Sequence, residues 1–277
     1  MLLRSGRTGL PRRGSEPRLD RRHALGGLLA LGSAAAGATV ANAYYPLAGL
    51  PNDLVTPTGE RRQHRLPDGS LLLLNARTRV DLRCTNKECV LRLHEGALSL
   101  TAIPDAARAF LICTSEGVIR PSGARVMVHQ QIRRTLVVAP DSEVEIVTAT
   151  GTRATLPAGT GTRFDNVLIG HPRPDLLAET AWETGWIDVY DRPLIEVIDA
   201  LRPYREGPLL ISMAAGGLLA RGCYSLDDSD AALRALQTDM PIQIRQITPW
   251  YTSIDLAPRA KSPADRHAWP HAPSDRA

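Results

Sequence analysis

The sequence predicts a mainly β protein followed by a small α+β domain. Residues 60–165 form short runs of alternating apolar and polar side chains, which turn residues separate about every ten positions. No amphipathic segment of helix length interrupts these runs, whereas two such segments occur after residue 183. The pattern favours a sandwich, a roll or a solenoid for the first domain, and the sequence does not choose among the three.

The N-terminal residues 1–23 are rich in arginine and lack any periodic apolar pattern, so we expect them to be disordered. The whole chain carries a formal charge of +4 and this segment alone carries +5, which leaves −1 for the rest. A nearly neutral body without a basic stripe argues against nucleic-acid binding, because phosphate recognition needs clustered positive charge.

Residues 24–45 form an uncharged run of small and apolar side chains, about as long as a membrane span. The preceding pair Arg21-Arg22 and the small residues Ala41–Ala43, where a peptidase could cut, also fit a signal segment. We expect either a single-pass anchor in the inner membrane or a cleaved leader, and a buried core helix is the remaining alternative. Both of the first two interpretations export the chain from about residue 46.

The folded part of the chain is expected between two irregular segments. Residues 46–59 contain three prolines and are predicted to be a linker, and residues 258–277 have the composition of a disordered tail. Between them we expect a β-rich domain at 60–165 and an α+β domain at 183–247.

Turn chemistry and cysteines give the main local predictions for the β-rich domain. Asp68 and Gly69 stand between two apolar runs and predict a hairpin turn, because glycine adopts a positive φ without strain. Cys84 and Cys89 flank a turn between two predicted strands, and an exported compartment would allow a disulfide there. Strand register decides whether the two Cβ atoms face each other, so a pair of free thiols stays the alternative.

The remaining cysteines and two glycines receive structural interpretations. Cys113 and Cys223 have no spacing that fits a zinc site and are expected to be small buried residues. Gly96 and Gly222 are expected to be structural positions of the same kind as Gly69.

The second domain has the predicted order β-α-β-β-α-β, with helices near 192–204 and 228–239. Most of its large apolar residues follow helix or strand spacing and are expected in the core. The alternative is that part of a helix face or a free sheet edge docks another protein. The candidate partner-binding residues are Trp186, Leu194, Leu201, Tyr204, Leu233 and Leu236.

No motif in the sequence points to catalysis. A Gly-x-Ser-x-Gly elbow and a phosphate-binding glycine loop are both missing, and His94 in "HEGAL" has no second histidine four residues later. We therefore expect a protein that is not an enzyme and that uses no metal or cofactor. An exported module that binds an envelope polymer or ligand is the second hypothesis, and an exported hydrolase is the third.

The order of several weak motifs resembles the FecR family of transmembrane sigma-factor regulators. The resemblance runs from about Thr58 to about Ile247. It includes Gly59-Glu60, the stretch Leu66–Ser70 with Leu74-Asn75-Ala76, and the later residues Trp186, Pro193-Leu194, Tyr204, Gly222 and Asp228.

The resemblance implies a periplasmic FecR domain at 60–165 and a C-terminal signalling domain at 183–247. Family members receive a signal from the N-terminal domain of a TonB-dependent outer-membrane transducer, commonly one that carries iron–siderophore cargo. They relay it across the inner membrane to an extracytoplasmic-function sigma factor. The family usually places a helical sigma-binding domain before the membrane span, where this chain has only residues 1–23. We therefore expect an upstream start, a second chain that binds the sigma factor, or a purely periplasmic member.

Overall fold

The computed structural model describes residues 53–103, 109–123, 125–248 and 251–258. The chain divides into two units, 1–46 and 47–277, and every described residue belongs to the second. The predicted disordered N-terminus, the membrane or signal segment, residues 46–52 of the predicted linker and residues 259–277 of the predicted tail therefore lie outside the described residues. The described half of the predicted linker contains a strand, Asp53–Val55. Among the helices that are described, none is long and apolar enough to cross a membrane.

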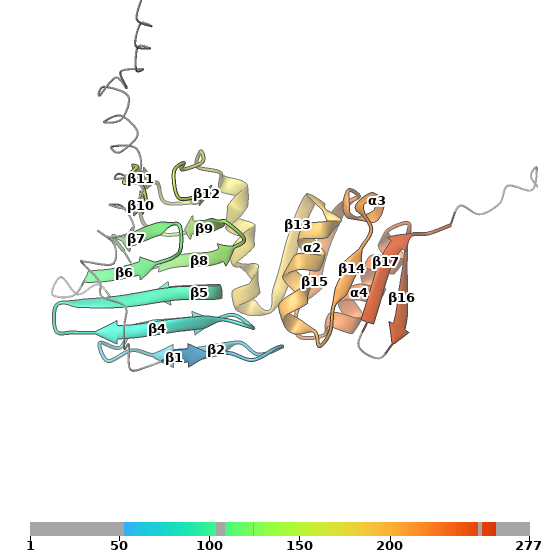
Figure 1. Ribbon diagram of the computed structural model, residues 1–277, viewed down its shortest axis with the longest axis horizontal. Coiled ribbons are helices and arrows are strands. Elements are labelled where there is room, and N and C mark those ends of the chain that lie inside the picture. Colours follow the sequence, from blue (N-terminus) through green and yellow to red (C-terminus); the bar gives the residue numbers. More distant parts are fainter. Residues whose placement is uncertain (1–52, 104–108, 124, 249–250, 259–277) are drawn as a thin grey trace, which may run out of the picture. The chain divides into compact units, whose positions relative to one another are not determined.

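The β-rich domain consists of two sheets that share one long strand, β5 (Figure 1). The first half of β5 pairs with β4 and, in parallel, with β6, and this sheet continues through β7, β10 and β11. The second half of β5 pairs with β3 and β8, and this sheet continues through β9 and β12. The prediction of a mainly β fold is confirmed.

The strand bounds of this domain follow. β1 is Asp53–Val55, β2 is Arg62–Arg65, β3 is Leu71–Leu74, β4 is Arg79–Cys84, β5 is Glu88–Thr101 and β6 is Ala109–Cys113. β7 is Gly117–Pro121, β8 is Arg125–Gln131, β9 is Arg134–Ala139, β10 is Val144–Thr148, β11 is Arg153–Leu156 and β12 is Thr160–Phe164. The short strands β1 and β2 add to β4 and β3.

Gly96 lies where β5 passes from one sheet to the other. Its φ is +85°, and a Cβ atom there would come within 2.2 Å of the Thr78 hydroxyl and 2.7 Å of the Arg77 carbonyl. Only glycine fits both the backbone conformation and the space. Leucine, isoleucine and valine side chains from both sheets fill one core beneath this junction, among them Leu72, Leu91 and Ile146. The alternation seen in the sequence therefore reports which side of each strand faces the core.

A segment of 3-10 helix, η1 (Pro174–Thr184), leads from the β-rich domain to the C-terminal domain. The predicted small α+β domain is confirmed, and its order is the expected β-α-β-β-α-β with two additions, a short helix between the second and third strands and a strand at the end. Its elements are β13 (Trp186–Pro193), α2 (Leu194–Leu201), η2 (Arg202–Tyr204), β14 (Leu209–Ile211), α3 (Met213–Gly216), β15 (Leu219–Ser225), α4 (Ser229–Asp239), β16 (Ile242–Thr248) and β17 (Tyr251–Leu256).

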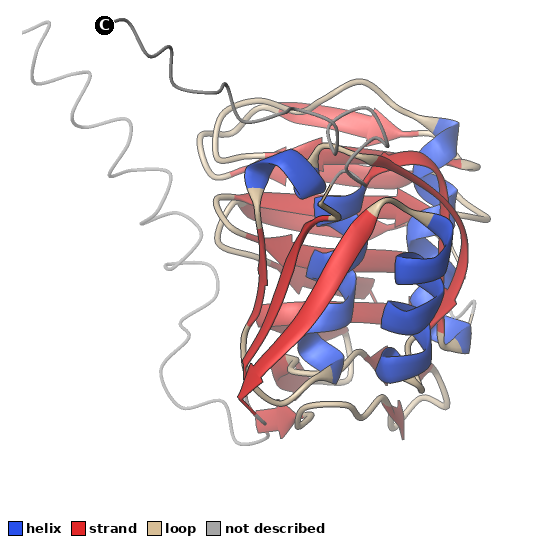
Figure 2. Ribbon diagram, turned by 90° about the vertical axis from the view of Figure 1, so that its right-hand side faces the viewer, coloured by secondary structure: helices blue, strands red, loops and turns tan. Residues whose placement is uncertain are grey.

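The last strand was not included in the predicted domain. β17 lies beyond residue 247, yet it is the middle strand of a sheet with the order β14-β17-β16 and pairs in parallel with β14. A short alternating run before a polar tail resembles a loop in the sequence, and only the pairing with two other strands identifies it. α2 and α4 pack against the strands of this domain, as Figure 2 shows.

The two helices begin where the sequence places start signals. The carboxylate of Asp228 accepts a hydrogen bond of 2.8 Å from the amide of Ala231 at the start of α4. Pro193 precedes α2, whose four buried residues follow helical spacing. These helices carry the core that fixes β13 in place, and β13 forms part of the surface described next.

Candidate functional site

Five of the six predicted partner-binding residues have buried side chains. Each exposes 8% or less of its surface, and three expose none. The five are Leu194, Leu201, Tyr204, Leu233 and Leu236. A side chain in the core cannot touch a partner while the domain stays folded, so these residues support the domain from inside. Trp186 differs, because 47% of its surface is exposed.

Trp186 lies in the wall of a groove of about 830 Å³. The β-rich domain contributes one wall, which consists of residues 75–77 and 94–97, Ser115, the region around the β8–β9 turn and Arg163 of β12. The other wall comes from the C-terminal side and consists of part of η1, the first half of β13 and one face of α2. The groove therefore lies between the β-rich domain and the C-terminal domain, and both contribute to it. We refer to it below as the groove.

Two features of the groove suit a protein partner. Ile132, at the tip of the β8–β9 turn, is 92% exposed, and Trp186 offers an aromatic surface in the opposite wall. Exposed apolar residues that face one space together often mark an interaction site. Arg133 and Arg134 follow Ile132 directly, and their side chains are exposed as well. The turn thus presents one apolar residue followed by two cationic ones.

Four of the charged side chains that line the groove form a network. The Glu179 carboxylate accepts hydrogen bonds from Arg163 at 3.0 Å and from Arg192 at 2.7 Å, and Arg192 also pairs with Glu196. Burial lowers the pKa of Arg163, and the nearby Arg192 and Arg134 contribute in the same direction. Two arginines therefore share one carboxylate at this point, which fixes the position of η1 relative to β12 and β13.

Some hydrogen-bond donors beside this network lack acceptors. Among the described residues, the indole N–H of Trp182 and the Nε–H of Arg163 have no partner, and both atoms are buried. His129 also lines the groove, and burial lowers its pKa. The neutral form of this imidazole is therefore favoured at neutral pH, so it adds no positive charge to the arginine network.

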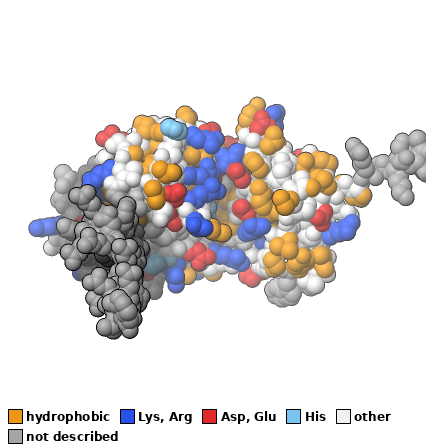
Figure 3. Space-filling model, turned by 45° about the horizontal axis from the view of Figure 1, so that its top comes forward, with side chains coloured by type: hydrophobic (Ala, Val, Ile, Leu, Met, Phe, Trp, Pro, Cys, Tyr) orange, Lys and Arg blue, Asp and Glu red, His pale blue; other side chains and the backbone are white. Residues whose placement is uncertain are grey.

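Positive side chains group on one face of the molecule. On the face shown in Figure 3, lysine and arginine side chains gather in a band across the middle, and hydrophobic side chains lie on both sides of it. The charge balance of the sequence did not indicate this grouping, because the acidic residues cancel the sum. Only the fold brings Arg163 and Arg192 to the same carboxylate.

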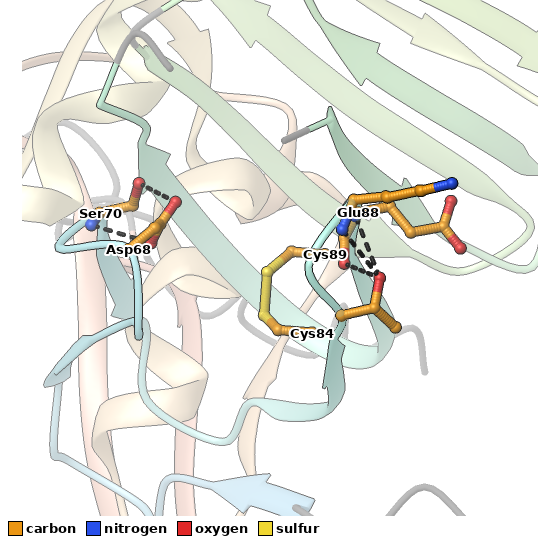
Figure 4. Close-up of a disulfide and its surroundings, with 7 residues drawn as sticks. Asp68, Ser70, Cys84, Glu88 and Cys89 are labelled. Atoms are coloured by element: carbon orange, nitrogen blue, oxygen red, sulfur yellow. Dashed lines mark hydrogen bonds between the residues drawn. A yellow bond between two sulfur atoms is a disulfide. The ribbon is translucent and has the colours of Figure 1, made fainter. Parts of the chain in front are cut away.

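The predicted structural residues all lie in turns or tight backbone positions. Gly69 has a φ of +87°, and the Asp68 carboxylate accepts hydrogen bonds from the amide and hydroxyl of Ser70, as Figure 4 shows. Gly222 has a φ of +135° in β15, opposite Val189 of β13. Asp68, Gly69 and Gly222 shape the fold and do not line the groove, whereas Gly96 does line it.

The cysteines divide into a bonded pair and two thiols. Cys84 and Cys89 are cross-strand partners on β4 and β5 and form a disulfide, which Figure 4 shows. Burial raises the pKa of Cys113 to about 11, so this thiol is inert at neutral pH. Cys223 is exposed, contrary to the expectation that it is buried, because its side chain leaves the outer face of β15.

The part of the chain that the structure describes contains no group of three or more His, Cys, Asp or Glu residues with the geometry of a metal site. The sequence had not indicated the groove residues Ile132, Arg163 and Glu179, which come from three separate elements. One signal was available, because an isoleucine between polar residues in a hairpin turn is unusual. The pairing of Arg163 with Glu179 had no signal in the sequence.

Residues 52–145 match the family model described as FecR protein. This confirms the resemblance to the FecR family for that part of the chain. No curated protein sequence matches the chain.

Two crystal structures of a candidate anti-sigma factor from Parabacteroides distasonis ATCC 8503 share the fold of this chain. Each is 20% identical to it in sequence. The first has a TM-score of 0.64 and covers 75% of this chain and 99% of that chain. The second has a TM-score of 0.63 and covers 73% and 98%. The shared fold thus extends well past the residues that the family model matches.

Proposed function

We propose that this chain, whose residues 52–145 form a FecR domain, is an exported regulator of an extracytoplasmic-function sigma factor. It would act by protein–protein contacts and without chemistry of its own. The observation that carries the proposal is the FecR domain itself. The fold shared with a candidate anti-sigma factor over 99% of that protein's structure supports it.

We propose that the groove receives the signalling domain of an outer-membrane transducer. Trp186 and Ile132 are large exposed apolar residues on opposite walls, and aromatic residues with apolar neighbours commonly dominate binding energy. The surrounding arginines would select a partner with acidic side chains next to an apolar one. Of the six residues that the sequence suggested for partner binding, this assigns direct contact to Trp186 alone.

The location of the protein is part of the proposal. The uncharged segment 24–45 would hold the chain in the inner membrane or direct its export, so that the folded domains lie in the periplasm. The N-terminal sequence and intact mass of the native protein, recovered separately from membrane and periplasmic fractions, test this. A chain that starts at Met1 in the membrane supports an anchor, and one that starts near Tyr44 in the periplasm supports a cleaved leader. Recovery in the cytoplasm would contradict export.

The sigma-factor contact requires a route across the membrane. An anchored chain would reach the sigma factor through its residues 1–23 or through a second cytoplasmic protein. A reporter gene under a promoter of the candidate sigma factor tests regulation directly. Deletion of this chain's gene should change reporter output in the presence of inducer, and unchanged output would contradict the proposal.

Docking can be tested with two matched variants of the same strand. Trp186→Ala removes an aromatic side chain from the groove, whereas Tyr190→Ala removes one that is 76% exposed and does not line the groove. We expect Trp186→Ala to weaken binding of the purified transducer domain about tenfold or more, as for other central aromatic residues, and Tyr190→Ala to leave it within about twofold.

Isothermal titration calorimetry gives the dissociation constants. Equal affinities of the two variants and the parent protein would contradict docking in the groove. Saturable binding of an envelope polymer, together with no binding of any transducer domain, would instead support the alternative of an exported binding module.

A further inference from the structure

The segment between β1 and β2 of the β-rich domain forms hydrogen bonds with the C-terminal domain. Residues 56–61 join β1, in one sheet, to β2, in the other. The amide of Gly59 donates a hydrogen bond of 3.0 Å to the carbonyl of Pro203 in η2. Any displacement of η2 therefore acts directly on this segment.

Arg61 forms the second contact between the segment and the C-terminal domain. Its guanidinium donates two hydrogen bonds, of 2.8 and 3.1 Å, to the carboxylate of Asp227. The same guanidinium lies 5.8 Å from the ring centre of Tyr204 and donates to its hydroxyl at 3.4 Å. The Arg61 side chain is 18% exposed and that of Asp227 is 64% exposed, so only the arginine half of this ion pair is shielded from solvent.

Tyr204 connects this ion pair to the supporting loop 75–78. Its side chain is 8% exposed, and its hydroxyl donates to the side-chain carbonyl of Asn75. Burial raises the pKa of Tyr204, so the phenol keeps the proton that this hydrogen bond requires. The Asn75 side chain also accepts a bond of 2.8 Å from the amide of Ala76.

Gly185 lies next to the ion pair between Arg61 and Asp227. A Cβ atom at Gly185 would lie 2.6 Å from the Asp227 carboxylate and 2.8 Å from the Arg61 guanidinium. Gly185 ends η1 with a φ of +89°, a conformation that favours glycine, and a larger residue would displace the ends of the Asp227 and Arg61 side chains. The chain therefore passes beside the ion pair at the point where the C-terminal domain begins.

The groove ends at the same place. Pro203, whose carbonyl accepts the Gly59 bond, also lines the groove, and so does Asn75, which accepts the Tyr204 bond. α2 leads directly into η2, and its residues Glu196 and Asp199 belong to the groove wall. A partner in the groove would thus touch the helix that carries Tyr204.

We propose that Arg61 and Tyr204 form a latch through which the C-terminal domain holds residues 56–61. While the latch is closed, the segment is fixed between loop 75–78 and η2. When α2 and η2 move, the contacts that Gly59 and Arg61 make with the C-terminal domain are lost together, and residues 59–61 become mobile. Residues 56–58 keep their hydrogen bonds to loop 75–78. That a partner in the groove causes this movement rests on the proposed function, whereas the latch itself does not.

Hydrogen–deuterium exchange on the purified full-length chain, without any partner, tests the latch. Asp227→Ala removes the exposed half of the ion pair, and Tyr204→Phe removes only a hydroxyl. We expect the amide of Gly59 to exchange about threefold to tenfold faster in each variant, because the bonds that exclude solvent from it open more often.

Two control variants carry the same chemistry elsewhere in the C-terminal domain. Arg221→Ala removes a surface ion pair with Asp191, and Tyr224→Phe removes a buried hydroxyl that donates to a backbone carbonyl at 3.0 Å. Amide exchange at residues 58–61, divided by exchange in β8 and β9, should be unchanged in both controls.

The latch is refuted if Asp227→Ala and Tyr204→Phe leave that ratio at its parent value, or if the controls raise it equally. Because no partner is present, this result is independent of the docking experiment. If exchange at Gly59 rises in these variants but the groove binds no transducer domain, the proposed function is contradicted and the latch is still supported.

Discussion

Leu201 and Trp186 should separate folding from docking, although the sequence suggests the same role for both. The Leu201 side chain exposes no surface and lies in the core at the end of α2. Replacing it by alanine leaves a cavity and should cost about 3 kcal/mol of the free energy of unfolding, within the usual range of about 2–5. For a protein of this size the melting temperature should fall by roughly 6–12 °C.

The opposite result is expected for Trp186. About half of its surface is exposed, so its replacement by alanine should cost at most about 2 kcal/mol of stability. It should nevertheless weaken binding of the transducer domain about tenfold or more, while folded Leu201→Ala protein should bind normally at low temperature.

Circular dichroism melting curves and calorimetric titrations of both variants provide the comparison. The reasoning is refuted if Leu201→Ala melts with the parent protein. It is also refuted if the two variants lose binding to the same extent while both remain folded. In that case the buried and the exposed residue would contribute to docking in the same way, which their positions do not allow.

Three further predictions concern the β-rich domain and the free thiol. Serine at both positions of the Cys84–Cys89 disulfide should lower the free energy of unfolding by about 2 kcal/mol in a urea titration, because the bridge closes a short loop; equal midpoints would contradict this. Gly96→Ala should lower the free energy of unfolding by more than about 2 kcal/mol, since backbone and side-chain atoms occupy the space of the new Cβ. Gly151 also has a positive φ but no atom within 4 Å of a new Cβ, so Gly151→Ala should lower it by only about 1 kcal/mol. Equal losses in the two variants would show that space at Gly96 is not limiting. Burial and then the Asp188 carboxylate raise the pKa of Cys223, so Asp188→Asn should lower that pKa and speed alkylation by iodoacetamide near pH 8, and an unchanged rate would exclude this effect of the carboxylate.

Much of the β-rich domain could be predicted from local pattern. The apolar positions of Val144–Thr148 match the alternation of buried side chains in β10. β3 consists of four leucines, so only the structure shows that alternate ones are buried. Asp68-Gly69 forms the expected turn because its chemistry is local. The same holds for α4, whose start Asp228 caps through a contact with a residue three positions away.

The candidate site could not be predicted in this way, because helical spacing shows which residues share a face and not what covers that face. Leu194 and Leu236 have the spacing of a docking surface, and the structure covers both with the rest of the C-terminal domain. β17 was missed for a related reason, since its stability comes from pairing with β14 and β16.

The sequence by itself determined the fold class, the position of the turns, the two helices of the second domain and the resemblance to the FecR family. Each depends on residues that are close together along the chain. Only the tertiary structure decided that Trp186 faces a groove, that Arg163 and Arg192 share Glu179, and that Arg61 reaches Asp227. These contacts join residues of different elements, up to 166 positions apart in the case of Arg61 and Asp227, and their geometry exists only after those elements have packed.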